Sequence, residues 1–175
     1  IHRDVKPANL FLCQLGTSYD FCKLLDFGLV KRLLADGESW MTVDGAIAGT
    51  PSFLAPEVAA GAREVDGRVD LYGLGCVAYW LLTGTLVFDE PNAAAAMAAH
   101  LQKTPEPPSQ RVEWPIPEDL ERLVMQCLAK RPEDRPESAA ELARLAAECR
   151  GVTPWTEEDA ERWWRLNAPA RAAMH

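Results

Sequence analysis

The sequence predicts an α+β fold in which a short β-hairpin precedes a mostly helical region. Two apolar runs, at residues 10–13 and 22–25, flank a Gly-, Thr-, Ser- and Asp-containing segment at 16–20, which predicts a strand, a loop and a second strand. After residue 56, apolar residues recur at three- and four-residue steps, which is the period of an α-helix. Because strands and helices do not alternate along the chain, a parallel sheet with crossover helices is not expected.

The first long helical segment runs from Val69 to Leu82 and is apolar on nearly all sides, which predicts a central, buried helix. Gly84 stands where such a helix would end. A second helix is expected over residues 91–101. Residues 104–117 contain five prolines and are expected to form an irregular connection.

Three further helices are expected toward the C-terminus. The first is amphipathic and covers residues 120–128. Ser138 and Glu141 form the pattern of a capping box for the second, and Thr156 opens the third. This last segment contains three tryptophans, Trp155, Trp163 and Trp164. We expect them to dock the helix on the rest of the fold, because exposed tryptophan clusters are unusual on monomers. The alternative is that they begin a region that follows this chain.

The composition of the chain argues against several classes of function. The 175 residues include 18 Lys+Arg and 26 Asp+Glu, for a net charge of −8, which disfavours nucleic-acid binding through phosphates. No apolar run is long enough to span a membrane. The 5 cysteines contain no C-x-x-C pair and the 3 histidines are scattered, so free thiols rather than a zinc site are expected. The chain length fits one domain or most of one.

Polar residues at the start of the chain suggest phosphoryl transfer. Asp4, Lys6 and Asn9 lie close together in one tight loop and supply a carboxylate to orient a hydroxyl, a cation for phosphate and a neutral oxygen ligand. Asp26 follows the second apolar run and adds a carboxylate. Because Mg²⁺ prefers one or two carboxylates plus phosphate oxygens and water, Asn9 and Asp26 can meet at one ion across the hairpin.

Three strings carry a family resemblance. Residues 2–9, His-Arg-Asp-Val-Lys-Pro-Ala-Asn, resemble the kinase catalytic loop H-R-D-L-x-x-x-N, with Val for the usual Leu. Residues 26–28, Asp-Phe-Gly, resemble the metal-binding D-F-G, and residues 55–57, Ala-Pro-Glu, resemble the A-P-E that ends the activation segment. The chain thus resembles the eukaryotic-type Ser/Thr protein kinases of bacteria over roughly residues 1–150, and residues 151–175 are expected to form a helical extension or linker. The implied fold is the helical C-terminal lobe of a protein kinase.

The resemblance implies a role for each matched residue. Asp4 would accept or orient the proton of the substrate hydroxyl, Lys6 would contact the γ-phosphate, and Asn9 and Asp26 would hold the Mg²⁺ of Mg·ATP. Thr50 would hydrogen-bond Asp4 and Lys6 and help exclude tyrosine. Phe11 would line the adenine site, and His2 and Phe27 would stack in the regulatory spine. Gly28 would complete the metal-binding motif, and Asp70, with Gly73 nearby, would fix the catalytic loop from the buried helix. Glu57 and Arg135 would form a buried ion pair.

Regulation is implied by the residue beside Asp4. In the family, an arginine at the position of Arg3 usually receives a phosphate on the activation loop. Thr42 is the leading candidate for that phosphate and Ser39 the second. The alternative is an unmodified loop.

The chain begins at Ile1, directly at the catalytic loop, so we expect it to be part of a longer protein. The Gly-rich loop, the strand lysine and its helix glutamate would belong to an N-terminal lobe outside this chain, which would be its main partner. The parent is expected to be cytoplasmic, with any membrane anchor outside this chain, and to phosphorylate Ser or Thr of protein substrates. The 175-residue piece alone is expected to expose apolar surface and to fold poorly.

Two alternatives remain open. A truncated, catalytically inert kinase-like lobe could act as a binding or scaffold module, and the sequence upstream of Ile1 would discriminate it. A small-molecule kinase of the aminoglycoside-phosphotransferase type shares the catalytic Asp and Asn, but lacks the Thr50 and 55–57 segment, so it ranks below the others.

Overall fold

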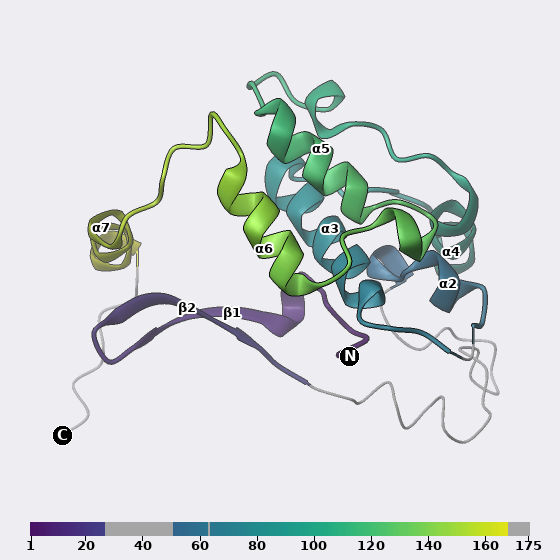
Figure 1. Ribbon diagram of the computed structural model, residues 1–175, viewed down its shortest axis with the longest axis horizontal. Coiled ribbons are helices and arrows are strands. Elements are labelled where there is room, and N and C mark those ends of the chain that lie inside the picture. Colours follow the sequence, from purple (N-terminus) through teal and green to yellow (C-terminus); the bar gives the residue numbers. More distant parts are fainter. Residues whose placement is uncertain (27–50, 63, 168–175) are drawn as a thin grey trace.

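The two apolar runs near the start of the chain form one antiparallel hairpin, β1 (Leu10–Leu15) and β2 (Ser18–Leu24). A single 3₁₀ turn, η1 (Pro7–Asn9), leads into β1. The computed structural model describes residues 1–26, 51–62 and 64–167. Within these ranges the hairpin extends from a helical body (Figure 1), so the predicted α+β class is confirmed.

The connection within the hairpin is shorter than predicted. Ser18 and Asp20 belong to β2, and the chain reverses at Gly16, whose φ of 61° is readily adopted only by glycine. The register then shifts, because Cys13 pairs with Phe21 while Leu15 pairs with Ser18. This bulge places Asp20 in the left-handed region, with φ 55°.

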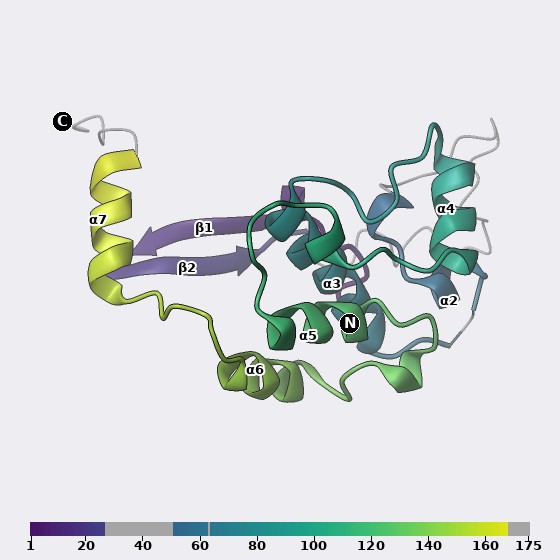
Figure 2. The same cartoon turned by 90° about the horizontal axis from the view of Figure 1, so that it is seen from above.

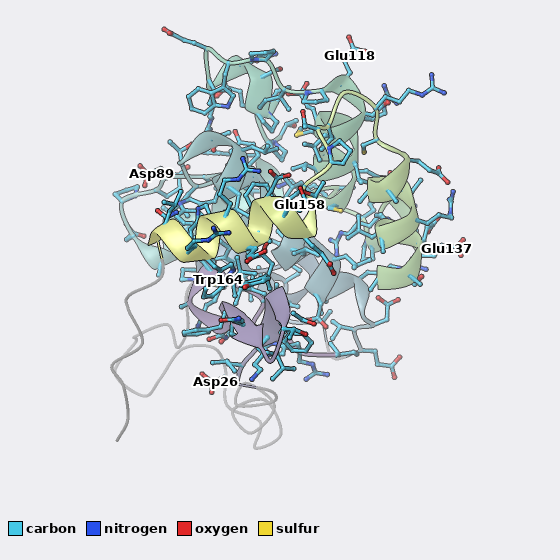
Figure 3. All side chains as sticks on the ribbon, turned by 90° about the vertical axis from the view of Figure 1, so that its left-hand side faces the viewer. Asp26, Asp89, Glu118, Glu137, Glu158 and Trp164 are labelled. Atoms are coloured by element: carbon cyan, nitrogen blue, oxygen red, sulfur yellow. The ribbon has the colours of Figure 1, made fainter. Side chains whose placement is uncertain are left out.

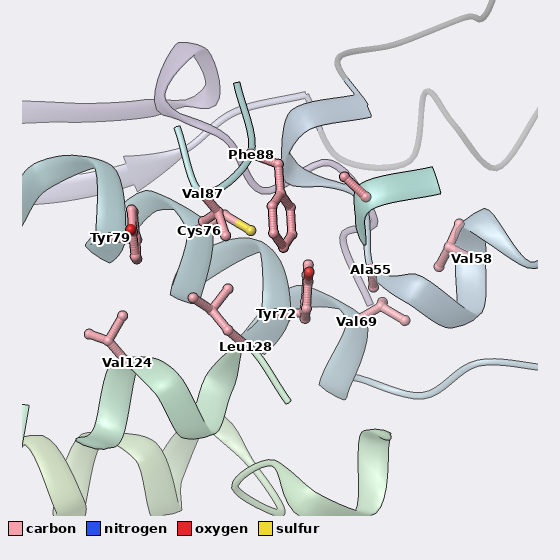
Figure 4. Close-up of a cluster of buried hydrophobic side chains, with 11 residues drawn as sticks. Ala55, Val58, Val69, Tyr72, Cys76, Tyr79, Val87, Phe88, Val124 and Leu128 are labelled. Atoms are coloured by element: carbon pink, nitrogen blue, oxygen red, sulfur yellow. The ribbon is translucent and has the colours of Figure 1, made fainter. Parts of the chain in front are cut away.

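The central helix is α3 (Arg68–Thr83), and it ends as predicted. Gly84 follows with φ 71° and donates its N–H to the carbonyl of Trp80. Side chains of α3 form the middle of the main core (Figure 4); its cluster comprises Ala55, Val58, Val69, Tyr72, Cys76, Tyr79, Val87, Phe88, Ala99, Val124 and Leu128.

Part of the surface of α3 is exposed, which agrees with the expectation that this piece alone exposes apolar surface. Leu74, Trp80 and Leu81 are 39%, 38% and 71% exposed, so α3 is not buried on all sides. Apolar side chains of this size are usually buried in a folded domain.

The remaining elements pack on α3, on one another or on the hairpin. Helix α5 packs on α3, and α4 packs on α2 and on η2 (Figures 1 and 2). The proline-rich connection is irregular as predicted, except for one 3₁₀ turn. The bounds are η2 (Pro51–Phe53), α2 (Pro56–Ala59), α4 (Ala93–Gln102), η3 (Pro108–Gln110), α5 (Glu118–Cys127), η4 (Pro132–Asp134), α6 (Ala139–Glu148) and α7 (Glu157–Asn167). None of the described helices is long and apolar enough to cross a membrane.

The two predicted caps differ in detail. Ser138 Oγ accepts the N–H of Glu141 at 3.1 Å, but the Glu141 carboxylate accepts the N–H of Glu137 rather than that of Ser138. The box before α7 is complete: Thr156 Oγ1 accepts the N–H of Asp159, and Asp159 Oδ2 accepts the N–H of Thr156, both at 3.2 Å. Only the second pattern therefore forms the reciprocal pair.

Helix α7 docks on the hairpin, and not on the helical body (Figures 1 and 2). The indole Nε1 groups of Trp155 and Trp164 donate to the two carboxylate oxygens of Asp20, each at 2.6 Å (Figure 3 shows Trp164 above the hairpin). Within α7, Ala160 is buried, whereas Trp163 remains exposed. The expected docking thus occurs, at the bulge of β2. The boundary at residue 150 stays a prediction.

Candidate active site

The loop that contains Asp4 is anchored to α3 through its backbone. The two carboxylate oxygens of Asp70 accept the N–H groups of His2 and Arg3, each at 2.7 Å. Arg3 has φ 70°, a conformation that a non-glycine residue keeps only where its surroundings fix it. Asp70 therefore fixes the chain immediately before Asp4.

A close approach at Gly73 gives the second anchor. A Cβ added there would lie 2.9 Å from the carbonyl oxygen of Val5 and 3.1 Å from its Cβ. Val5 is buried, so it has little room to retreat. The loop can lie this close to α3 only because position 73 has no side chain.

His2 joins the catalytic loop to the end of the hairpin. Its Nδ1 accepts the N–H of Asp4 at 3.3 Å, so Nε2 carries the ring proton and donates to the carbonyl of Leu25 at 2.8 Å. Leu25 in turn donates its N–H to the carbonyl of Asn9 at 2.9 Å. The start and the end of the hairpin are thereby held next to each other.

Asp4, Lys6 and Asn9 form one polar cluster. Asn9 Nδ2 donates to Asp4 Oδ2 and to the Asp4 carbonyl, both at 2.9 Å, and Lys6 Nζ lies 2.9 Å from Asp4 Oδ2. Asn9 is buried, which fixes the orientation of its amide. Because Nδ2 makes both hydrogen bonds, the carbonyl Oδ1 is the atom of Asn9 that can bind a cation.

Asp26 lies at the other end of the hairpin. It is exposed and has φ 62°, and it directly follows the Leu25 that is bonded to Asn9. Asn9 Oδ1 and the Asp26 carboxylate are hard oxygen ligands of the kind Mg²⁺ uses. No group of three or more His, Cys, Asp or Glu in the described ranges could hold a metal by itself. The donor set therefore fits an ion whose remaining ligands are phosphate oxygens and water.

The predicted ion pair between Glu57 and Arg135 is present. The Arg135 Nη1 and Nη2 groups donate to Glu57 Oε1 and Oε2, both at 2.7 Å, and the guanidinium is buried. The same guanidinium donates to the carbonyls of Ala129, Arg68 and Lys130 at 2.9, 3.0 and 3.1 Å. All three nitrogens of the buried Arg135 guanidinium therefore donate hydrogen bonds. These bonds hold α2 next to the start of α3 and to the turn at η4.

Other predicted site residues are not brought into this cluster. Phe11 lies on β1 with 51% of its surface exposed. Five candidates fall outside the described residues, so the roles assigned to them stay predictions: Phe27, Gly28, Ser39, Thr42 and Thr50.

Sequence reasoning missed two polar contacts. His100, treated as one of three scattered histidines, is completely buried and bonded to Tyr72. Asp20, treated as a loop residue, receives two indole N–H groups. The partners of His100 and Asp20 are 28 and at least 135 residues away, and no local pattern reveals such pairs.

Comparison with known proteins places this geometry in a family. The family described as "Protein kinase domain" matches residues 1–145. The chain is 47% identical over 140 residues to serine/threonine-protein kinase Pkn1 of Myxococcus xanthus, covering 80% of this chain and 20% of that protein. It is 38% identical to pkn3 of the same organism, covering 99% and 30%, and 40% identical to PknB of Mycolicibacterium smegmatis, covering 97% and 27%. The chain therefore spans less than a third of each of these relatives. By motif, helical architecture and sequence, the chain belongs to the protein kinase domain family.

Proposed function

We propose that this chain supplies the catalytic loop of a protein Ser/Thr kinase that transfers the γ-phosphate of Mg·ATP to hydroxyl groups of proteins. The observation that carries the proposal is the Asp4 carboxylate, which Lys6 Nζ and Asn9 Nδ2 both contact at 2.9 Å. The names of the relatives, all serine/threonine-protein kinases, support the same activity.

In this proposal Asp4 positions the nucleophile. Asp4 Oδ2 is engaged by Lys6 and Asn9, and among the described residues no hydrogen bond is made to Oδ1, which would accept the proton of a substrate hydroxyl. Lys6 places its charge beside the transferred phosphoryl group, where it stabilises negative charge in the transition state. Catalysis of this kind is mostly positioning, which agrees with a loop whose backbone Asp70 fixes from α3.

Asn9 and Asp26 would hold the Mg²⁺. Asn9 would use Oδ1 and Asp26 its carboxylate, and the bound ion would neutralise phosphate charge. The two residues are placed by the same hydrogen bond, from Leu25 N–H to the Asn9 carbonyl. The hairpin thus sets the spacing of the metal ligands.

The test is Asp4→Asn in the full-length product of the gene. Turnover on a Ser/Thr peptide should fall by about 10²–10⁴-fold, because the hydroxyl loses its acceptor, while the KM for ATP should change little. Radiolabelled phosphate transfer measures both. Asp89→Asn is the matched control, because Asp89 is an exposed carboxylate far along the chain from the cluster. Equal turnover in the Asp4 variant and the wild type would remove Asp4 from this role, and a wild type that binds ATP without transfer would favour the inert scaffold.

A further inference from the structure

His100 connects three parts of the helical body from a completely buried position near the end of α4. Its Nδ1 lies 2.7 Å from the hydroxyl of Tyr72 on α3. The ring also meets Phe88 edge-on, with centroids 5.0 Å apart at 87°, and Tyr72 at 5.6 Å and 69°. A buried polar ring held this closely is a fixed structural link, and none of the roles described above uses it.

The ring of His100 is neutral at physiological pH. Burial lowers the pKa of His100 to about 4, with the charge of Lys130 acting in the same direction and the backbone of Ser52 acting against both. Lys130 Nζ donates to the His100 carbonyl at 2.7 Å, which explains the nearby positive charge. Burial raises the pKa of Tyr72, so its hydroxyl stays protonated and shares a hydrogen bond with Nδ1 of the neutral ring.

Helix α4, which carries His100, packs on η2, the turn that begins the segment next to the loop of Asp4. The Nε2 atom of His100 has no hydrogen-bond partner among the described residues. Packing of α4 therefore joins His100 to η2, whereas a hydrogen bond joins it to α3.

Segment 51–58 lies directly beside the catalytic loop. A Cβ at Gly73 would meet the carbonyl of Phe53 at 3.6 Å, next to the carbonyl of Val5 at 2.9 Å. The far end of this segment is held by the ion pair of Glu57 and Arg135, and the Arg135 guanidinium lies 4.9 Å above the ring of Tyr72. Tyr72 therefore contacts Arg135 through its ring face and His100 through its hydroxyl.

We propose that His100, through its hydrogen bond to Tyr72, is a positioning residue that holds segment 51–58 in place for the protein substrate. This inference rests on the proposed function, because segment 51–58 lies beside the loop in which Asp4 would hold the substrate hydroxyl. His100 contacts neither substrate nor nucleotide in this role.

Two tyrosines of α3 provide a matched test. Tyr72 and Tyr79 are both fully buried, but the hydroxyl of Tyr79 has no hydrogen-bond partner among the described residues. In the full-length protein, Tyr72→Phe should raise the KM for a Ser/Thr peptide about five- to tenfold, the effect of one buried hydrogen bond, and leave the KM for ATP within about twofold. Tyr79→Phe should behave as wild type.

Variants of His100 and a second readout complete the test. His100→Ala should raise the peptide KM at least as much as Tyr72→Phe. His100→Asn keeps a hydrogen-bonding group near the position of Nδ1 and should recover most of that loss. Hydrogen exchange of the backbone amides of segment 51–58 should accelerate in Tyr72→Phe and not in Tyr79→Phe.

Three results would overturn the inference: equal peptide KM in the two tyrosine variants, a parallel rise in the KM for ATP, or no recovery by His100→Asn. If the wild type transfers no phosphate, the proposed function fails by itself. The exchange measurement then decides alone: faster exchange confined to segment 51–58 supports the inference, and unchanged exchange rejects it.

Discussion

The helical body and the hairpin begin from similar apolar runs but bury them very differently. In the body, Tyr72, Tyr79 and Leu128 are at most 1% exposed (Figure 4). On the hairpin, Leu12 and Leu15 are each more than half exposed. Helix α5 and the turns η2 and η3 pack on α3, whereas the two-stranded ribbon has two faces and receives α7 on β2. Apolar sequence alone therefore does not decide burial; the number of neighbouring elements does.

The candidate active site lies at the junction of these two regions. Asp70 and Gly73 fix the catalytic loop to the well-packed body. Asn9 and Asp26 instead take their spacing from the hairpin, and Asn9 is buried while Asp26 is exposed. We therefore expect mutations in the body to act mainly on stability, and mutations on the hairpin to act mainly on the placement of the two proposed metal ligands.

The largest expected effect is in the body, at Arg135. Arg135→Ala leaves Glu57 without its partner in a largely buried position, so it should destabilise the body by about 3–5 kcal/mol. Hydrogen exchange of the α3 amides in the full-length protein measures the loss. Arg131→Ala is the control, because Arg131 in the same segment is exposed and pairs with Glu133 at the surface; it should change little. A similar loss of stability in both variants would mean that the buried ion pair stabilises the body no more than the surface pair does.

An intermediate effect is expected where the body meets the catalytic loop. Gly73→Ala places a Cβ against the backbone of Val5, which should cost about 1–3 kcal/mol and displace Asp4, with a fall in turnover. Gly67→Ala, where an added Cβ meets nothing within 4 Å, should leave both unchanged. Peptide phosphorylation and thermal unfolding of the two variants compare them. Normal turnover in Gly73→Ala would show that the loop yields without consequence.

The smallest effect is expected on the hairpin. Trp164→Phe keeps an aromatic ring but removes the donor to Asp20, which should weaken the docking of α7 by about 1 kcal/mol. Exchange of the β2 amides should accelerate while exchange in α3 stays constant. Trp163→Phe is the matched control, because Trp163 is exposed, makes no hydrogen bond to Asp20 among the described residues, and keeps with Phe an aromatic ring against Trp164. An unchanged β2 in the Trp164 variant would show that α7 does not stabilise the hairpin.

Local patterns predicted the elements better than their exact ends. The helix that ends at Gly84 and the hairpin were both predicted, because glycine and the spacing of apolar residues act within a few positions. The loop was predicted too long, since a two-residue turn at Gly16 suffices and the bulge at Asp20 leaves no local sign. The capping box at Ser138 was half right because the Glu141 side chain finds the amide of Glu137 instead.

The sequence by itself was enough to suggest the proposed chemistry: the identities, order and spacing of Asp4, Lys6, Asn9 and Asp26 indicate phosphoryl transfer. The family resemblance also predicted the distant contacts of Asp70 and of Glu57 with Arg135, but only the tertiary structure showed the contacts that match no family motif. Tyr72 with His100, and Asp20 with two tryptophans, are pairs that packing brings together across 28 to 144 residues. The chemistry of a side chain follows from its residue type and can be read from the sequence. Contacts such as these form only when several elements have packed, because no short-range pattern constrains them.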